Sequence, residues 1–131
     1  MYLLDTHIFF WWSVEPGKLS RKHNRLLTKG SAAGEPVALA RITLWELAML
    51  VERRRIEAPL PLDVWLDEIE RTPEIELLTL TSAIAFDSVG LDSSFPKDPA
   101  DRIIAATARC RGLTLMTADE NIVESGLVRT A

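Results

Sequence analysis

The sequence predicts one α/β domain, spanning residues 1–131, with a mainly parallel central sheet and helices on both of its faces. Short apolar runs that suit buried strands alternate along the chain with segments of helical periodicity. These runs are continuously apolar rather than alternately polar, which is typical of parallel strands covered on both sides. The chain has 131 residues, 47% of them hydrophobic, which is enough for one packed core.

Turn and cap signals define the elements in the first half of the chain. Pro16-Gly17 breaks the chain, Ser20 is a helix cap, and Gly30 is the expected end of that helix. Three consecutive arginines close a later helix, where they complement its dipole. The expected elements are a strand at 2–4, a helix around 8–12, a helix at 20–29, a loop at 31–35, a strand at 37–40 and a helix at 43–55.

The second half follows the same alternation. Asp98-Pro99 is a strong start signal for a long helix, and Gly112 is its stop. The expected elements are a short helix around 64–70 after the proline-rich segment 59–61, a strand at 75–80, a short helix capped by Thr81, the long helix, a strand at 113–116 and an edge strand at 127–129.

The overall charge restricts the classes of function. A net charge of -4 argues against binding nucleic acid through a broad basic face. Cys110 is the only cysteine, so an internal disulfide and a thiolate zinc site are both excluded. No apolar stretch is long enough to cross a bilayer, and we expect a cytoplasmic protein.

Four carboxylates stand at or just beyond the C-terminal ends of predicted strands. In open parallel sheets ligands bind at that edge, so residues far apart in sequence are expected to share one pocket. Carboxylates that lie close together repel one another and need a cation among them. Oxygen ligands without a Cys or His cluster favour Mg²⁺ or Mn²⁺, and two such ions would offset the net charge of -4. The four are Asp5, Glu46, Asp101 and Asp119.

Each of these acids also has a structural explanation. Asp5 suits a turn, and Asp119 suits a helix cap. Glu46 lies three residues after Thr43, which is the capping-box spacing. Asp98 is an N-cap candidate, in which case Asp101 is an ordinary acid of the first helical turn. Only the joint placement of the acids favours a functional role.

Four segments of the chain resemble, in order and spacing, the motifs of the PIN-domain ribonucleases, in particular the VapC-type toxins of type II toxin–antitoxin systems. The match spans nearly the whole sequence, and four ordered motifs are far more specific than any one of them. The segments read LLDTH at 3–7, TLWELA at 43–48, DPADRIIAATA at 98–108 and LMTAD at 115–119.

The resemblance implies a Mg²⁺- or Mn²⁺-dependent endoribonuclease of the prokaryotic cytoplasm. It also implies a homodimer that is neutralised by a cognate antitoxin protein. Asp5, Glu46, Asp101 and Asp119 would be the metal-binding and catalytic acids, and Asp98 ranks below Asp101 because it has a capping role. Thr117 and Thr6 would support the site. Metal-assisted hydrolysis of RNA needs no nucleophile from the protein itself.

Several other residues have two interpretations. Arg102 and the three arginines 53–55 are candidates for contact with RNA phosphates, although solvated surface charge is the commoner role. His7 follows the first acid and is a candidate neighbour of the pocket. The aromatic run at 9–12 is too wide for one helical stripe, so Trp11 or Trp12 is a candidate contact for the antitoxin or a second subunit.

Two alternative functions remain open at this stage. One is another Mg²⁺-dependent phosphodiesterase, although the first motif lacks the acid pairs of phosphatases and receiver domains. The other is a non-catalytic RNA- or protein-binding module with the same fold. The RNA that is cut and the number of ions are not specified by the sequence.

Overall fold

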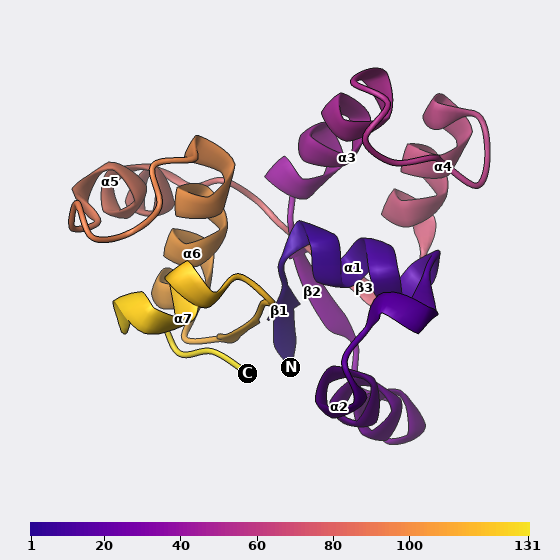
Figure 1. Ribbon diagram of the computed structural model, residues 1–131, viewed down its shortest axis with the longest axis horizontal. Helices are drawn as coiled ribbons and strands as arrows, with labels where there is room; N and C mark the ends of the chain where they lie inside the picture. The colour runs from indigo at the N-terminus through magenta and orange to yellow at the C-terminus, as the bar shows by residue number, and fades with distance from the viewer.

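Four parallel strands form the central sheet, in the order β3-β2-β1-β4, in the computed structural model, which describes residues 1–131 (Figure 1). The sheet is entirely parallel, so the expected α/β class is confirmed. The elements are β1 (Tyr2–Leu4), α1 (Thr6–Ser13), a 3-10 turn (Pro16–Lys18), α2 (Arg21–Ala32), β2 (Val37–Ala40), α3 (Ile42–Glu52), α4 (Leu62–Arg71), β3 (Ile75–Leu78), α5 (Ser82–Gly90), α6 (Pro99–Arg111), β4 (Thr114–Met116) and α7 (Glu120–Ser125).

Helices cover both faces of the sheet because neighbouring residues of a strand point in opposite directions. Leu3 belongs to a core cluster with residues of α6 and α7, whereas Leu4 belongs to a second cluster with residues of α1 to α4. Leu115 and Met116 of β4 divide in the same way. Figure 1 shows α5, α6 and α7 on one side of the strands and the first four helices on the other.

Three expected caps are confirmed by hydrogen bonds. Ser20 Oγ accepts from the His23 N–H at 3.1 Å, and Thr81 Oγ1 accepts from the Ile84 N–H at 3.2 Å. Asp98 caps α6 by accepting from the Asp101 N–H at 3.2 Å, and Gly112 ends that helix in the left-handed conformation. The start and end of the long helix were thus correctly predicted.

Two helix ends differ from the expectation. Helix α2 continues through Gly30 to Ala32, and the left-handed glycine that follows it is Gly34, so the expected loop is shorter. Helix α3 stops at Glu52 rather than at residue 55, because Arg54 turns the chain with a φ of 56°.

Two strands are shorter than expected. Strand β3 ends at Leu78, and the expected edge strand at 127–129 is reduced to a single bridge between Leu115 and Thr130. The Leu115 N–H donates to the Arg129 carbonyl, and the Ala131 N–H donates to the Leu115 carbonyl. The chain therefore runs beside β4 for only one bridge. None of the helices is both long and apolar enough to span a membrane.

Candidate active site

The expected acids meet in one pocket at the C-terminal edge of the sheet. Strands β1 and β4 pair in parallel, so the residues that follow them leave the sheet on the same side. The pocket has a volume of about 410 Å³. Its lining includes five carboxylates from four segments of the chain, which are Asp5, Glu46, Asp98 with Asp101, and Asp119.

Two buried threonines hold the innermost acids in place. Asp5 accepts hydrogen bonds from the Thr6 N–H at 2.9 Å and from Thr117 Oγ1 at 2.8 Å. Thr117 Oγ1 also accepts from the Asp119 N–H at 3.0 Å, which joins the loop after β4 to the same network. The Thr6 hydroxyl donates to Glu46 Oε1. Thr6 and Thr117 therefore fix the orientation of the acids by hydrogen bonds.

Three of the acids cap helices as well as lining the pocket. The cap residues are Asp5 for α1, Asp98 for α6 and Asp119 for α7. Glu46 does not take part in a capping box, because the N-cap of α3 is Arg41 and the Glu46 carboxylate binds Thr6 instead. The capping explanation for Glu46 is therefore wrong, whereas those for Asp98 and Asp119 are confirmed. Asp5 was expected only to suit a turn, and its role as the cap of α1 was not predicted.

Carboxylate oxygens of Glu46, Asp98 and Asp101 all lie within 4.8 Å of one another, a separation that one divalent cation can bridge. The donors are hard oxygens with no sulfur or imidazole in the group, which fits Mg²⁺ or Mn²⁺ better than zinc or copper. Asp98 therefore lies closer to the centre of the site than its ranking below Asp101 suggested. It caps α6 and faces the other acids at the same time.

The crowding of acids changes their protonation. Burial raises the pKa of the Asp5 carboxyl, and burial together with the charge of Asp5 raises the pKa of Glu46. Desolvation, followed by repulsion from the other four acids, raises the pKa of Asp101 to about 8. A group of carboxylates that resists ionisation in this way gains most from a cation placed among them.

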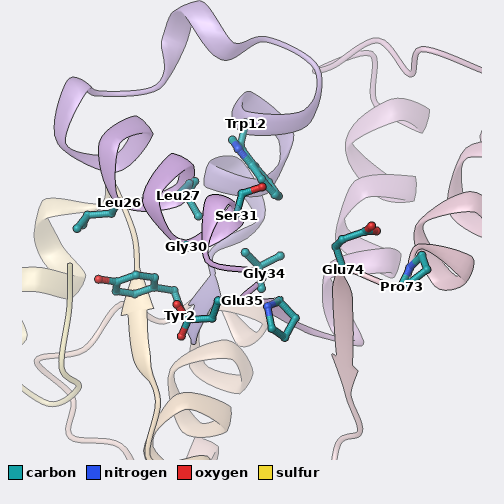
Figure 2. Close-up of a pocket in the computed structure, with 12 residues that line it drawn as sticks. Tyr2, Trp12, Leu26, Leu27, Gly30, Ser31, Gly34, Glu35, Pro73 and Glu74 are labelled. Carbon is teal, nitrogen blue, oxygen red and sulfur yellow. The ribbon is translucent and has the colours of Figure 1, made fainter.

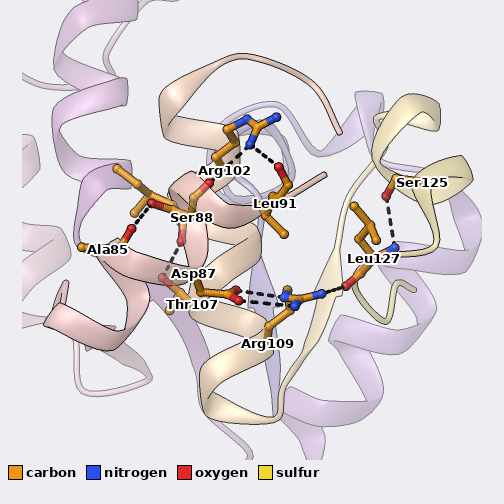
Figure 3. Close-up of polar contacts among 10 residues, drawn as sticks. Ala85, Asp87, Ser88, Leu91, Arg102, Thr107, Arg109, Ser125 and Leu127 are labelled. Carbon is orange, nitrogen blue, oxygen red and sulfur yellow. Dashed lines mark hydrogen bonds and ion pairs between the residues drawn. The ribbon is translucent and has the colours of Figure 1, made fainter. Parts of the chain in front are cut away.

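Arg102 points away from this pocket and makes a different set of contacts. Its Nε donates to the Pro96 carbonyl at 3.0 Å. Figure 3 shows the guanidinium reaching the end of α5. Its other hydrogen bonds go to the carbonyls of Ser88, Leu91, Asp92 and Phe95. Because the guanidinium is held by backbone carbonyls, the geometry does not support the phosphate contact considered for Arg102.

The neighbouring tryptophans of α1 face different parts of the molecule. Trp11 lines the acidic pocket, where its ring lies 5.9 Å from that of His7. Trp12 instead lines a hollow of about 300 Å³ beside α2 (Figure 2). Successive helical residues point about 100° apart, so the helical periodicity could have separated Trp11 from Trp12, which were expected to be equivalent.

Known proteins match this arrangement over almost the whole chain. The family model for the PIN domain matches residues 2–126. This chain belongs to the PIN-domain family. Ribonuclease VapC22 of Mycobacterium tuberculosis is 38% identical over 120 residues, which cover 92% of this chain and 88% of that protein. The resemblance to VapC-type proteins expected from the four motifs is thus confirmed.

Several solved structures share the fold. VapBC2 from Rickettsia felis, bound to a DNA fragment from their promoter, aligns with a TM-score of 0.72 at 18% identity, covering 99% of this chain and 96% of that one. FitAcB from Neisseria gonorrhoeae aligns with a TM-score of 0.71 at 22% identity over the same shares. At these identities the likeness establishes the fold alone.

Proposed function

We propose that this PIN-domain protein is a Mg²⁺- or Mn²⁺-dependent endoribonuclease that acts in the bacterial cytoplasm as the toxin of a toxin–antitoxin pair. The observation that carries the proposal is the convergence of five carboxylates in one pocket, in a chain 38% identical to a protein named as a VapC ribonuclease. Asp5, Glu46, Asp101 and Asp119 are the proposed catalytic and metal-binding acids, and Asp98 joins them.

In this proposal Glu46, Asp98 and Asp101 hold the divalent ion, whose charge would stabilise negative charge on the scissile phosphate and acidify a water. Asp5 remains fixed by Thr6 and Thr117 beside that group. That position suits a carboxylate that accepts a proton from the attacking water.

Replacement of Asp5 by Asn tests the proposed chemistry. Asn keeps an oxygen for the Thr6 N–H but cannot ionise, so cleavage of RNA in Mg²⁺ or Mn²⁺ should fall by at least about a hundredfold while thermal unfolding stays cooperative. Single-stranded RNA and flap DNA assayed side by side separate a ribonuclease from another phosphodiesterase. Full activity of the Asn variant, or no cleavage of RNA by the wild type, would reject the assignment.

Asp98 offers a test that separates metal binding from helix capping. Asp98→Asn retains a good N-cap but loses the negative charge, whereas Asp98→Ala loses both. We expect both variants to bind Mn²⁺ at least tenfold more weakly by calorimetry, and only the Ala variant to lose about 1 kcal/mol of stability. An Asn variant with wild-type Mn²⁺ affinity would remove Asp98 from the metal site.

The proposed partner of the Trp12 hollow is an apolar segment of the cognate antitoxin. Figure 2 shows Trp12 of α1 and Leu26 and Leu27 of α2 around this hollow, with Tyr2 below them. The solved neighbours described as VapBC complexes support a partner of this kind. Trp12→Glu should abolish co-purification with the product of the adjacent gene, and Trp45→Glu, on the exposed surface of α3, should not.

Helix α5 carries the exposed apolar side chains that best suit the proposed homodimer. Phe86 and Val89 are 81% and 80% exposed, which is unusual for large apolar residues. Sedimentation of the wild type and of Phe86→Glu would test the assignment. A wild-type dimer that becomes a monomer in the variant supports this interface. If both proteins are dimers, the dimer contact lies elsewhere.

A further inference from the structure

Two arginines with no ion-pair partner stand on the wall of the acidic pocket. Arg53 and Arg55 both line the pocket and both are exposed to solvent. The five ion pairs of the protein all involve other residues. The guanidinium groups of Arg53 and Arg55 are therefore free to bind a ligand that enters the pocket.

The backbone of this turn separates the three consecutive arginines. Arg54 has a φ of 56°, the only positive value at a residue other than glycine, at a cost of about 1 kcal/mol. The turn is closed by the Arg55 N–H, which donates to the Leu50 carbonyl at 2.9 Å. As a result Arg54 lines a different hollow, beside Ile56 and Leu62, while its two neighbours face the acids.

The chemistry of the pocket favours a phosphate as the ligand of these arginines. A guanidinium binds phosphate oxygens through paired N–H donors and keeps its charge at every physiological pH. In a chain of net charge -4 these two groups place positive charge beside the acids, where a polyanion would otherwise be repelled. The charge is local, which explains how binding can occur without a broad basic face.

An aromatic surface from α1 completes the lining. Trp11 is half-buried, and its ring packs at 55° to that of His7, which is exposed. Indole faces bind unpaired bases by stacking, at about 1 to 3 kcal/mol per base. Bases within a duplex are already stacked on one another and cannot be bound in this way.

We propose that Arg53, Arg55 and Trp11 form a subsite for single-stranded RNA next to the catalytic acids. The arginines hold backbone phosphates that flank the scissile one, and Trp11 stacks on an unpaired base. This inference rests on the proposed ribonuclease function and specifies the form of the substrate. Arg54 and Arg102 lie outside the subsite, although the sequence alone does not distinguish them from Arg53 and Arg55.

Arg53→Gln and Arg55→Gln test the phosphate contacts, with Arg54→Gln as the matched control, which removes the same charge from the same turn. We expect KM for a 12-nucleotide single-stranded RNA to rise about fivefold in each test variant while kcat is unchanged, because the contact is uniform through the reaction. The control should keep both values of the wild type.

Binding measured without cleavage provides the second readout. In an Asp5→Asn background, fluorescence anisotropy with the same RNA at several KCl concentrations gives the salt dependence of affinity. Each test variant should reduce the slope of log K against log salt by about 0.7, the value for one phosphate of a single strand, and the control should leave it unchanged. Trp11→Leu should lower affinity at least fivefold without changing the slope.

Several outcomes would overturn the subsite. These are an Arg54→Gln variant equal to the test variants, a fall in kcat at constant KM, or a duplex of the same sequence bound as tightly as the single strand. If the wild type fails to cleave RNA but the variants lose binding as expected, the proposed function is wrong and the subsite stands. If the wild type cleaves RNA and the variants bind RNA normally, the proposed function stands and the subsite is wrong.

Discussion

Asp101 should make the metal-free protein less stable as the pH rises, and Asp101→Asn should remove that loss. The pKa of Asp101 is raised from 3.8 to about 8 in the folded protein, so folding favours the protonated form. The stability that depends on this proton is fully present below about pH 4 and is lost as the pH rises through 8. An Asn side chain mimics the protonated carboxyl at every pH.

The size of the effect follows from the shift of about four pKa units. At about 1.4 kcal/mol per unit the full difference is about 6 kcal/mol, and because Asp101 is half-buried, solvent screening reduces it to about 3 kcal/mol. For a domain of 131 residues this corresponds to about 10 °C in Tm. Because more than a quarter of the loss has already occurred at pH 5, Asp101→Asn should melt about 3 °C above the wild type there and about 10 °C above it at pH 8.5.

Thermal unfolding of both proteins in EDTA at pH 5, 6, 7 and 8.5 provides the measurement. Adding Mn²⁺ at pH 8.5 should raise the Tm of the wild type much more than that of Asp101→Asn, because the ion binds the ionised acids. A difference in Tm that stays constant from pH 5 to pH 8.5 would show that Asp101 is not held protonated by its neighbours, and the electrostatic account of the site would fail.

Three further changes have expected outcomes. Thr6→Val removes a donor to Glu46 that lowers the pKa of this acid, so the acid limb of the pH–activity profile should move to higher pH; an unmoved limb would exclude a role for this bond. Arg102→Ala leaves five carbonyls without their donor and should cost about 3 kcal/mol in urea unfolding, whereas a loss below about 1 kcal/mol would mean that water replaces the guanidinium. Arg54→Gly should raise the free energy of unfolding by about 0.5 to 1 kcal/mol by relieving the positive φ. A free energy of unfolding equal to or below that of the wild type would indicate that the turn is unstrained.

The convergence of the acids was predictable because it follows from topology. Once β1 and β4 are taken as parallel neighbours, Asp5 and Asp119 must leave the sheet at the same edge. The start of α6 was equally clear, since Asp98 before proline is a strong local signal. The first conclusion depends on the order of the strands, and the second on a signal of two neighbouring residues.

Other features depend on contacts between distant residues, which the sequence does not encode locally. The partners of Arg102 are carbonyls, and any residue type supplies a carbonyl, so no pattern reveals the contact. The end of α3 was misplaced because the left-handed residue there is Arg54 rather than glycine. The dual position of Asp98, as cap and as neighbour of Glu46, also required the packing of α6 against α3.

Three acids cap a helix and also line the acidic pocket, and this affects how related chains should be compared. Asp5, Asp98 and Asp119 each accept an N–H at the start of a helix, so selection for stability alone would preserve Asp or Asn there after catalysis was lost. Glu46 and Asp101 cap nothing and carry raised pKa values, so the fold would benefit from losing their charge. In diverged descendants of such a protein, retention of these two charged residues indicates that the protein is still catalytically active.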